Sequence, residues 1–236
     1  PPGMLVGSNG LPAQEAPSGY PLALPPARLL LDEPGHAWDI EDAVTKAAAA
    51  VFDDADATLA EMLAILGRRS VRDYLRRQFF KIHLAHYSKS RRKAPIYWPL
   101  AVPSRSWGVW VYAPTLSRET LFAIAGEAAR REALAAEAVR RLQAEREASG
   151  SGRSAREVAE ALTVEEALAE ELRTFRAEAD RIAGLGWEPD FDDGIILCAA
   201  PLATLFPAWP DAAKEREQIR EDDYPWATVS RWKGAL

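Results

Sequence analysis

Residues 96–113 read IYWPLAVPSRSWGVWVYA, and this stretch decides the fold class of a chain that otherwise looks helical. Its two halves are rich in β-branched and aromatic residues, and Pro103 and Ser104 separate them. This pattern predicts a short antiparallel pair of strands. Because proline cannot donate a hydrogen bond within a sheet, Pro99 places the first strand at an edge. The sequence therefore predicts an α+β protein in which the strands are the minority.

The sequence before this stretch has helical periodicity. Helices are expected over residues 39–52 and 55–66, with a stop at Gly67, and from the N-cap residue Ser70 to about His86. The last of these helices has one apolar stripe that we expect to be buried, formed by Val71, Leu75, Phe79, Ile82 and Ala85. Most of its cations fall off that stripe and are expected to face solvent or a partner: Arg69, Arg72, Arg76 and Lys81.

The sequence after residue 117 predicts two long helices. Apolar residues recur at heptad spacing in both, and the Gly/Ser-rich loop SGSGRS separates them. We expect an antiparallel coiled-coil hairpin up to about 45 Å long, at 1.5 Å per residue. Its predicted apolar positions are Leu121, Ala125, Ala128, Ala135, Val139 and Leu142 in the first helix, and Val158, Leu162, Leu168, Leu172, Phe175, Ala179 and Ile182 in the second.

Four segments follow from these patterns. Residues 1–38 hold eight of the 17 prolines and form an extended lead-in. Residues 39–116 form a basic platform of helices with the β-pair, and residues 117–183 form the coiled-coil hairpin. Residues 184–236, with a charged helix near 211–222, are expected to pack back on the platform. The predicted fold is thus α+β and mostly helical.

The charge of the chain is segregated. The net charge is −6, yet residues 68–105 contain eleven cations and one anion, a net charge of +10, which leaves −16 for the rest. A surface with an assigned partner explains such segregation. Pairing between this patch and the chain's own acidic helices explains it as well, and the sequence leaves both interpretations open.

Cysteine and hydropathy patterns point to the cytoplasm. The single cysteine, Cys198, excludes an internal disulfide framework and suits a reducing compartment. The longest apolar run, residues 195–206, contains Pro201 and is far shorter than the roughly 20 residues that a membrane-spanning helix needs. We therefore expect a cytoplasmic protein without a membrane partner.

Common catalytic and metal-binding motifs are absent from the sequence. The chain contains no phosphate-binding loop, no dinucleotide-binding glycine motif and no nucleophile elbow. His83 and His86 lie three residues apart on a helix, but no third ligand accompanies them, so a solvent-facing or core-edge pair is favoured over a metal site. Asp190, Asp192 and Asp193 do not have the spacing of a calcium loop and indicate an Asp-Gly turn before a strand. We predict neither catalytic residues nor a metal site.

The densest basic cluster lies beside aromatic residues, in residues 87–100, YSKSRRKAPIYWPL. Its cations suit contacts with phosphates, and nearby rings (Tyr97, Trp98, Trp107 and Trp110) could stack on exposed bases. The alternative is that these rings form the core face of the small sheet. The candidate DNA-binding residues are Lys89, Arg91, Arg92, Lys93, Tyr97, Trp98 and Arg105.

This cluster also carries a resemblance to a known family. Together with RDYLRRQFFKIHLAH before it, LPPARLLLDEPGHAWDIEDAV further upstream, and GWEPDFDDGIILCAAPLATLFPAW and DYPWATVSRW downstream, it resembles the C-terminal region of large adenine-specific DNA methyltransferases. The most similar kind are the PglX-like enzymes of BREX phage-defence systems, with relatives in type II restriction-modification and DISARM. The resemblance extends from about residue 22 to 232.

The resemblance implies a role without catalysis. The family's glycine-rich cofactor turn and Asn-Pro-Pro-Tyr-type adenine pocket have no counterpart in this sequence. S-adenosylmethionine is thus expected for the full-length enzyme, whereas no cofactor is expected in this chain. What the resemblance implies is a fragment or subunit that engages double-stranded DNA or docks on the methyltransferase core or other defence-system subunits. The alternative is a protein-docking module that uses the hairpin and the acidic surface.

Overall fold

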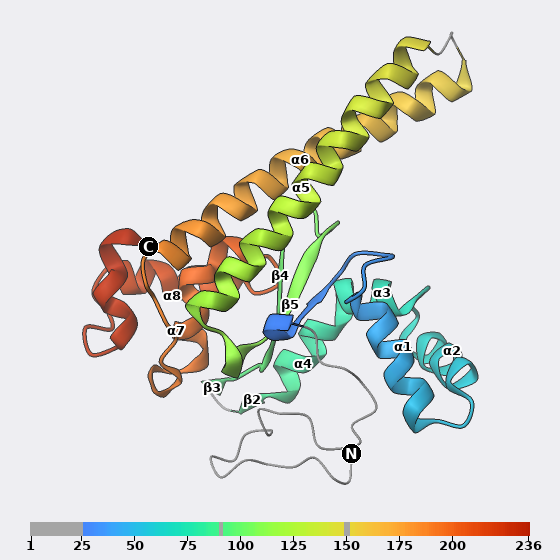
Figure 1. The fold of residues 1–236 in the computed structure, drawn as a ribbon. Helices are drawn as coiled ribbons and strands as arrows, with labels where there is room; N and C mark the ends of the chain where they lie inside the picture. The colour runs from blue at the N-terminus through green and yellow to red at the C-terminus, as the bar shows by residue number, and fades with distance from the viewer. Residues whose placement is uncertain (1–25, 90–91, 149–151) are drawn as a thin grey trace.

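The computed structural model describes residues 26–89, 92–148 and 152–236 (Figure 1). It is 69% helical and contains a three-stranded antiparallel sheet, which confirms the predicted, mostly helical α+β class. The strand order is β1-β5-β4, with β1 at Leu29–Leu31, β4 at Tyr97–Ala101 and β5 at Gly108–Tyr112. The strand that contains Pro99 therefore lies at an edge, as the sequence predicted.

Strand β1 was not predicted, because it lies within the proline-rich lead-in. Leu29 pairs with Val111, and Leu31 pairs with Val109. Both leucine side chains are buried. A run of three apolar residues has no alternating pattern, so nothing in its local sequence identifies it as a strand. The sheet thus recruits residues from the segment that was expected to be only a lead-in.

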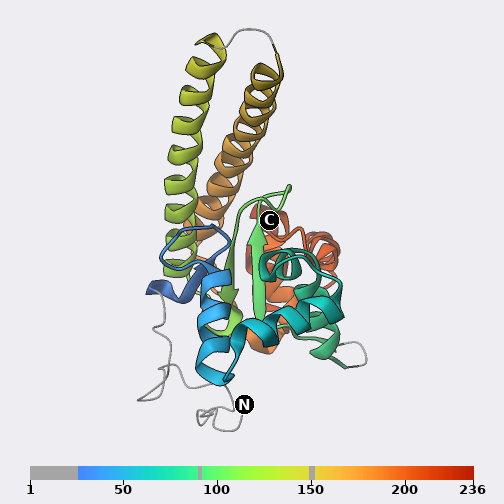
Figure 2. The ribbon, with the colours of Figure 1, turned by 90° about the vertical axis from the view of Figure 1, so that its right-hand side faces the viewer.

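The sheet is covered by helices on both faces (Figures 1 and 2). Because side chains alternate along a strand, Leu31, Trp98 and Val109 point into the main core, which also includes residues of the long helices and of the C-terminal segment. On the other face, Trp110 packs with Val71 and other residues of the N-terminal helices. Burial on both faces explains why β5 is apolar throughout its length.

The N-terminal helices begin and end close to the predicted positions. They are α1 (Ile40–Val51), α2 (Ala55–Leu66), α3 (Val71–Tyr74) and α4 (Phe80–His86), with a π-helical turn at Leu75–Phe79 between the last two. The side chains of Asp39, Asp54 and Ser70 accept hydrogen bonds from backbone N–H groups in the first turns that follow them. Gly67 ends α2 in the left-handed conformation, with φ at 63°.

The predicted apolar stripe of α3 and α4 is correct only in its first half. Val71 and Leu75 are buried, but Ile82 is 43% exposed and Ala85 is exposed as well. Phe80 and His83 are buried instead. The physical reason is the π-helical turn, which places five residues where an α-helix places about four and so rotates the following face.

The predicted helical hairpin consists of α5 (Arg118–Ala148) and α6 (Arg153–Gly184), which run antiparallel (Figures 1 and 2). All seven apolar positions predicted in the second helix are buried, whereas Val139 and Leu142 in the first are only partly buried. The lower half of the hairpin belongs to the main core, where the rings of Phe175 and Trp107 lie 5.4 Å apart. The core therefore crosses the predicted boundary between platform and hairpin.

The C-terminal segment packs against the sheet and α4. It contains η4 (Phe191–Asp193), α7 (Ile195–Ala199), η5 (Ala200–Leu205), α8 (Pro210–Arg220) and η6 (Thr228–Ala235). The ring of Phe80 lies 5.1 Å from that of Phe206 and 5.9 Å from that of Trp209. The Asp-Gly turn leads into the helix α7, so the strand expected there is wrong.

The aspartates of that turn hold the C-terminal tail in place. Asp190 accepts hydrogen bonds from the backbone N–H of Asp192 and from the hydroxyl of Thr228, and Asp193 accepts one from the backbone N–H of Val229.

Within the described residues, no single helix is long and apolar enough to cross a membrane. One pair, Ile195–Leu205 and Pro210–Arg220, meets the length and composition criteria when taken together, across a bend of 105°.

Candidate nucleic-acid interface

Three of the predicted stacking rings lie in the protein interior. Trp98 is 0% exposed, its indole N–H donates a hydrogen bond of 2.8 Å to the carbonyl of Pro95, and its ring lies 6.0 Å from that of Phe206. Trp107 and Trp110 are also buried. None of these rings can stack on a base while the protein is folded. The assignment of Trp98 to a DNA-binding site is therefore wrong, and the core interpretation holds for it.

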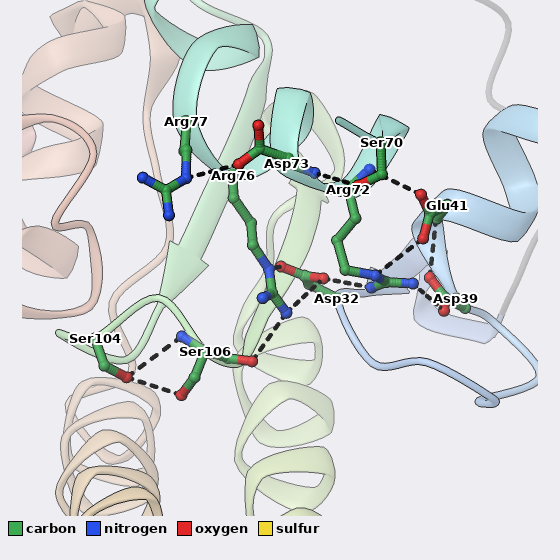
Figure 3. A network of polar contacts seen from close by, with 10 residues as sticks. All are labelled: Asp32, Asp39, Glu41, Ser70, Arg72, Asp73, Arg76, Arg77, Ser104 and Ser106. Atoms are coloured by element: carbon green, nitrogen blue, oxygen red, sulfur yellow. Dashed lines mark hydrogen bonds and ion pairs between the residues drawn. The ribbon is translucent and has the colours of Figure 1, made fainter. Parts of the chain in front are cut away.

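Two cations that were expected to face solvent lie in an internal ion network (Figure 3). Arg72 donates from Nη1 to Asp32 and from Nη2 to Asp39, both at 2.5 Å, and from Nε to Glu41 at 3.1 Å. Arg76 donates through Nε and Nη2 to Asp32. Asp32 and Asp39 are 5% and 2% exposed. The expectation that Arg72 and Arg76 point outward is wrong. Both pair with carboxylates of the chain itself, but Asp32 and Asp39 lie outside the acidic helices that were expected to supply them.

This network has a structural role. It joins α3 and the π-helical turn to the residue after β1 and to the N-terminus of α1, where Asp39 also accepts a hydrogen bond from the backbone N–H of Glu41. Burial lowers the pKa of Arg72, but its hydrogen bonds to Asp39 and Asp32 outweigh this effect and leave the pKa raised. The guanidinium thus remains charged and is saturated by internal carboxylates.

Lys93 and Arg105 also contact the chain itself. Lys93 forms an ion pair with Asp211 of α8, and the hydrogen bond from Lys93 is the main cause of the lowered pKa of Asp211. Arg105 donates a hydrogen bond of 2.8 Å to the carbonyl of Pro207. Both side chains connect the platform to the C-terminal segment. This structural role explains their positions without a contact to nucleic acid.

Lys89 and Arg92 of the basic cluster lie on two short paired strands. Strands β2 (Ser88–Lys89) and β3 (Arg92–Lys93) pair antiparallel directly after α4, with Lys89 opposite Arg92. Arg91 lies outside the described residues, as do the side chains of Lys89 and Arg92. Of the cations Lys89, Arg91 and Arg92, the structure thus describes only the backbone of Lys89 and Arg92.

A row of aromatic rings lies beside these two strands. The ring of His83 is 4.6 Å from that of Tyr87 and 5.6 Å from that of Tyr97, and Tyr97 is 5.5 Å from Tyr112. Tyr87 and Tyr97 are 40% and 43% exposed. The sequence prediction included Tyr97 but missed Tyr87, although Tyr87 immediately precedes β2. Of the tyrosines and tryptophans in this region, Tyr87 and Tyr97 are the exposed ones, whereas the tryptophans are buried.

His83 connects the aromatic row to the sheet. Its Nε2 atom accepts hydrogen bonds from the backbone N–H groups of Ile96, at 3.0 Å, and Tyr97, at 3.1 Å. Burial, and secondarily the charge of His86, lower the pKa of His83 from 6.5 to about 4. A neutral imidazole that accepts two backbone hydrogen bonds is a core-edge residue, which agrees with the interpretation favoured over a metal site.

We expect this histidine to make stability depend on pH. The unfolded chain takes up the proton near pH 6.5, whereas the folded protein resists protonation of His83 until about pH 4, so stability is lost as pH falls through this window. The loss should reach about 3 kcal/mol at most, at roughly 1.4 kcal/mol per pKa unit. Urea unfolding between pH 4 and 7.5 should show a steeper decline for the parent than for His83→Gln, and parallel profiles would contradict this assignment.

The Cys198 thiol and the possible metal ligands of the described residues do not form a reactive or metal-binding site. Burial, followed by the charges of Asp193 and Asp190, raises the pKa of the Cys198 thiol to about 12, which makes it a poor nucleophile. In the part of the chain that the structure describes, no group of three or more His, Cys, Asp or Glu residues could hold a metal ion.

Comparison with protein-family models and with curated proteins finds no match to this chain. The features of the candidate interface are therefore its charges and its exposed rings.

Proposed function

We propose that this chain is the non-catalytic, DNA-engaging C-terminal module of an adenine-specific, S-adenosylmethionine-dependent DNA methyltransferase in a cytoplasmic phage-defence or restriction-modification system. The observation that carries the proposal is the position of the β2–β3 hairpin, whose sequence includes Lys89, Arg91 and Arg92, beside the exposed rings of Tyr87 and Tyr97. Cations at such a site neutralise phosphates, and rings stack on bases that are not paired. The resemblance of residues 87–100 to the methyltransferase family supports the same role.

The combination of a basic hairpin and exposed rings suits DNA that an enzyme has opened locally. An intact duplex presents its phosphates, but its bases are stacked inside. Enzymes that modify a base extrude it from the stack and so expose neighbouring bases. In this proposal the hairpin holds the phosphate backbone while Tyr87 and Tyr97 contact bases at the opened site, and the methyltransferase core supplies the chemistry and the cofactor.

Replacing Lys89, Arg91 and Arg92 together by alanine should weaken binding to duplex DNA without loss of stability. If all three neutralise phosphates, the slope of log K against log salt should flatten by about 0.9 for each side chain removed. Fluorescence anisotropy of a labelled duplex at several salt concentrations measures this slope. Arg153→Ala is the matched control, since its side chain is 92% exposed near the tip of the α5–α6 hairpin. An unchanged slope in the triple variant would refute phosphate binding by these residues.

Tyr97→Ala should act differently from the triple variant. If the ring stacks on a base, affinity for a duplex with an unpaired base should fall by about 1–3 kcal/mol while the salt slope stays the same. Tyr97→Phe retains the ring and should bind as the parent does. Trp226→Ala is the control, because Trp226 is a 66% exposed ring in the C-terminal segment. Equal losses of affinity in Tyr97→Ala and Trp226→Ala would argue against a stacking site at Tyr97.

A protein-docking function is the alternative, and one observation favours it. The distal half of the α5–α6 hairpin extends away from the sheet, and Leu134 and Val164 on the hairpin are 46% and 63% exposed. Methyltransferase core or other defence-system subunits would be the partners. Competition separates the two functions: duplex DNA should displace a partner bound at the basic hairpin and should leave a partner on the α5–α6 hairpin in place.

A further inference from the structure

Helix α2 is apolar on nearly all sides, yet it contributes no buried residue. Nine of its twelve residues, ADATLAEMLAIL, are apolar, and every one of them is more exposed than the core residues of the other long helices. Leu59 and Leu63 pack partly against the cluster formed by Ile40, Val71 and Leu75. A helix that is apolar all round is normally enclosed by protein. Helix α2 therefore has more apolar residues than its contacts in this structure bury.

The outward-facing side of α2 is mostly apolar, with Glu61 among its apolar residues. Ala57, Ala60 and Ala64 are all exposed, and their spacing of three and four residues puts them in one row along the helix. Ile65 is exposed as well and lies at the edge of that row, about 100° around the helix from Ala64. Ile65 is 78% exposed, the highest value among the exposed large apolar residues of the described chain. Val51 and Phe52, at the end of α1 and directly before the turn into α2, are 71% and 48% exposed. We call Ala57, Ala60, Ala64 and Ile65 the α2 outer face.

Within residues 47–67 all charges are negative, and the nearest cations along the chain are Lys46 before this range and Arg68 after it. Asp53, Asp54, Asp56 and Glu61 are all exposed, and no lysine or arginine lies between residues 47 and 67. An anionic rim attracts a cationic partner and repels an anionic one. Because lipid headgroups and nucleic acids are neutral or anionic, this rim disfavours a membrane or DNA as the occupant. It favours a protein segment that is both apolar and basic.

We propose that the α2 outer face docks an amphipathic helix of another protein, whose apolar stripe is flanked by lysine or arginine. The three alanines allow a second helix to approach closely, since the side chains at the contact set the distance between helix axes. Ile65 supplies a larger apolar side chain at one edge of this face, and Glu61 lies within it to pair with a flanking cation. This recognition is independent of the proposed DNA contact and concerns a different surface.

Two synthetic helical peptides test this proposal. Both carry leucine at the a and d positions of their heptads, and one has lysine at e and g where the other has glutamate. The labelled lysine peptide should bind the full chain in fluorescence anisotropy, and the glutamate peptide should bind at least tenfold more weakly. Ile65→Ser should weaken binding of the lysine peptide at least tenfold, whereas Val164→Ser, which changes an exposed apolar residue on α6, should leave it unchanged.

Charge reversal makes the test stricter. Glu61→Lys should weaken binding of the lysine peptide and strengthen binding of the glutamate peptide. The triple alanine variant of Lys89, Arg91 and Arg92 should bind both peptides as the parent does, so failure of the DNA proposal and failure of this one are distinguishable. Equal binding of the two peptides, or no effect of Ile65→Ser, would overturn the proposal. Two other results would also overturn it, if the peptides fail to bind. One is a dimer of the chain that Ile65→Ser abolishes, and the other is binding to phosphatidylcholine vesicles that Ile65→Ser abolishes.

Discussion

Replacing Trp98 by alanine is expected to lower the free energy of unfolding by about 3–5 kcal/mol, because the ring is fully buried in the main core. The indole contacts Phe191 and Phe206 of the C-terminal segment, with ring centroids 6.5 and 6.0 Å away, so its removal leaves a cavity between the sheet and that segment. The surrounding structure cannot close such a cavity completely. Urea unfolding followed by circular dichroism measures the change.

Trp226→Ala is the matched control for this large effect. It removes the same ring from a position that is 66% exposed, so the free energy of unfolding should change by less than about 0.5 kcal/mol. Any Trp98→Ala protein that remains folded should bind duplex DNA with the parental salt slope. If the Trp98→Ala variant kept its stability and lost DNA affinity, this result would contradict the position of the ring in the core.

Replacing Arg72 by methionine should also destabilise the protein by about 3–5 kcal/mol, because it breaks a buried ion network from one side. Asp32 would keep Arg76 as a partner, but Asp39, which is 2% exposed, would no longer have the cation that its carboxylate binds. Methionine retains much of the volume of the arginine stem, so most of the destabilisation is electrostatic. Chemical unfolding measures it. Arg77→Ala, which removes a 70% exposed arginine paired with Asp73, should cost at most about 0.5 kcal/mol.

A second substitution identifies the source of that destabilisation. Asp39→Asn in the Arg72→Met background should recover part of the stability, because a neutral amide is less costly to bury than an unpaired carboxylate and still caps α1. In the parent background, the same substitution should be destabilising. Additive effects of the two substitutions in a double-mutant cycle would show that Arg72 and Asp39 do not interact, contrary to the structure.

The candidate interface could be predicted from the sequence only in part. The four cations within residues 89–93 and the neighbouring Tyr97 were visible as a local pattern. The partners of Arg72 and Lys93 were not visible, because Asp32 and Asp211 lie 40 and 118 residues away along the chain. Which of two adjacent rings is buried also depends on strand pairing: Trp98 points into the core, and Tyr97, its neighbour, points the other way and is exposed.

Local residues by themselves determined the helix limits, the hairpin and the edge position of β4. Asp39, Ser70 and Gly67 act within one turn of the residues they cap, and Pro99 acts through its own missing N–H, so these effects require no distant partner. Only the tertiary structure decided that 29–31 joins the sheet, that the π-helical turn rotates the face of α4, and that internal carboxylates neutralise part of the basic segment. The first and last of these depend on interactions between residues far apart in sequence, whose free energy exists only once the chain has brought them together. The π-helical turn lies within one helix, and no local residue pattern indicated it.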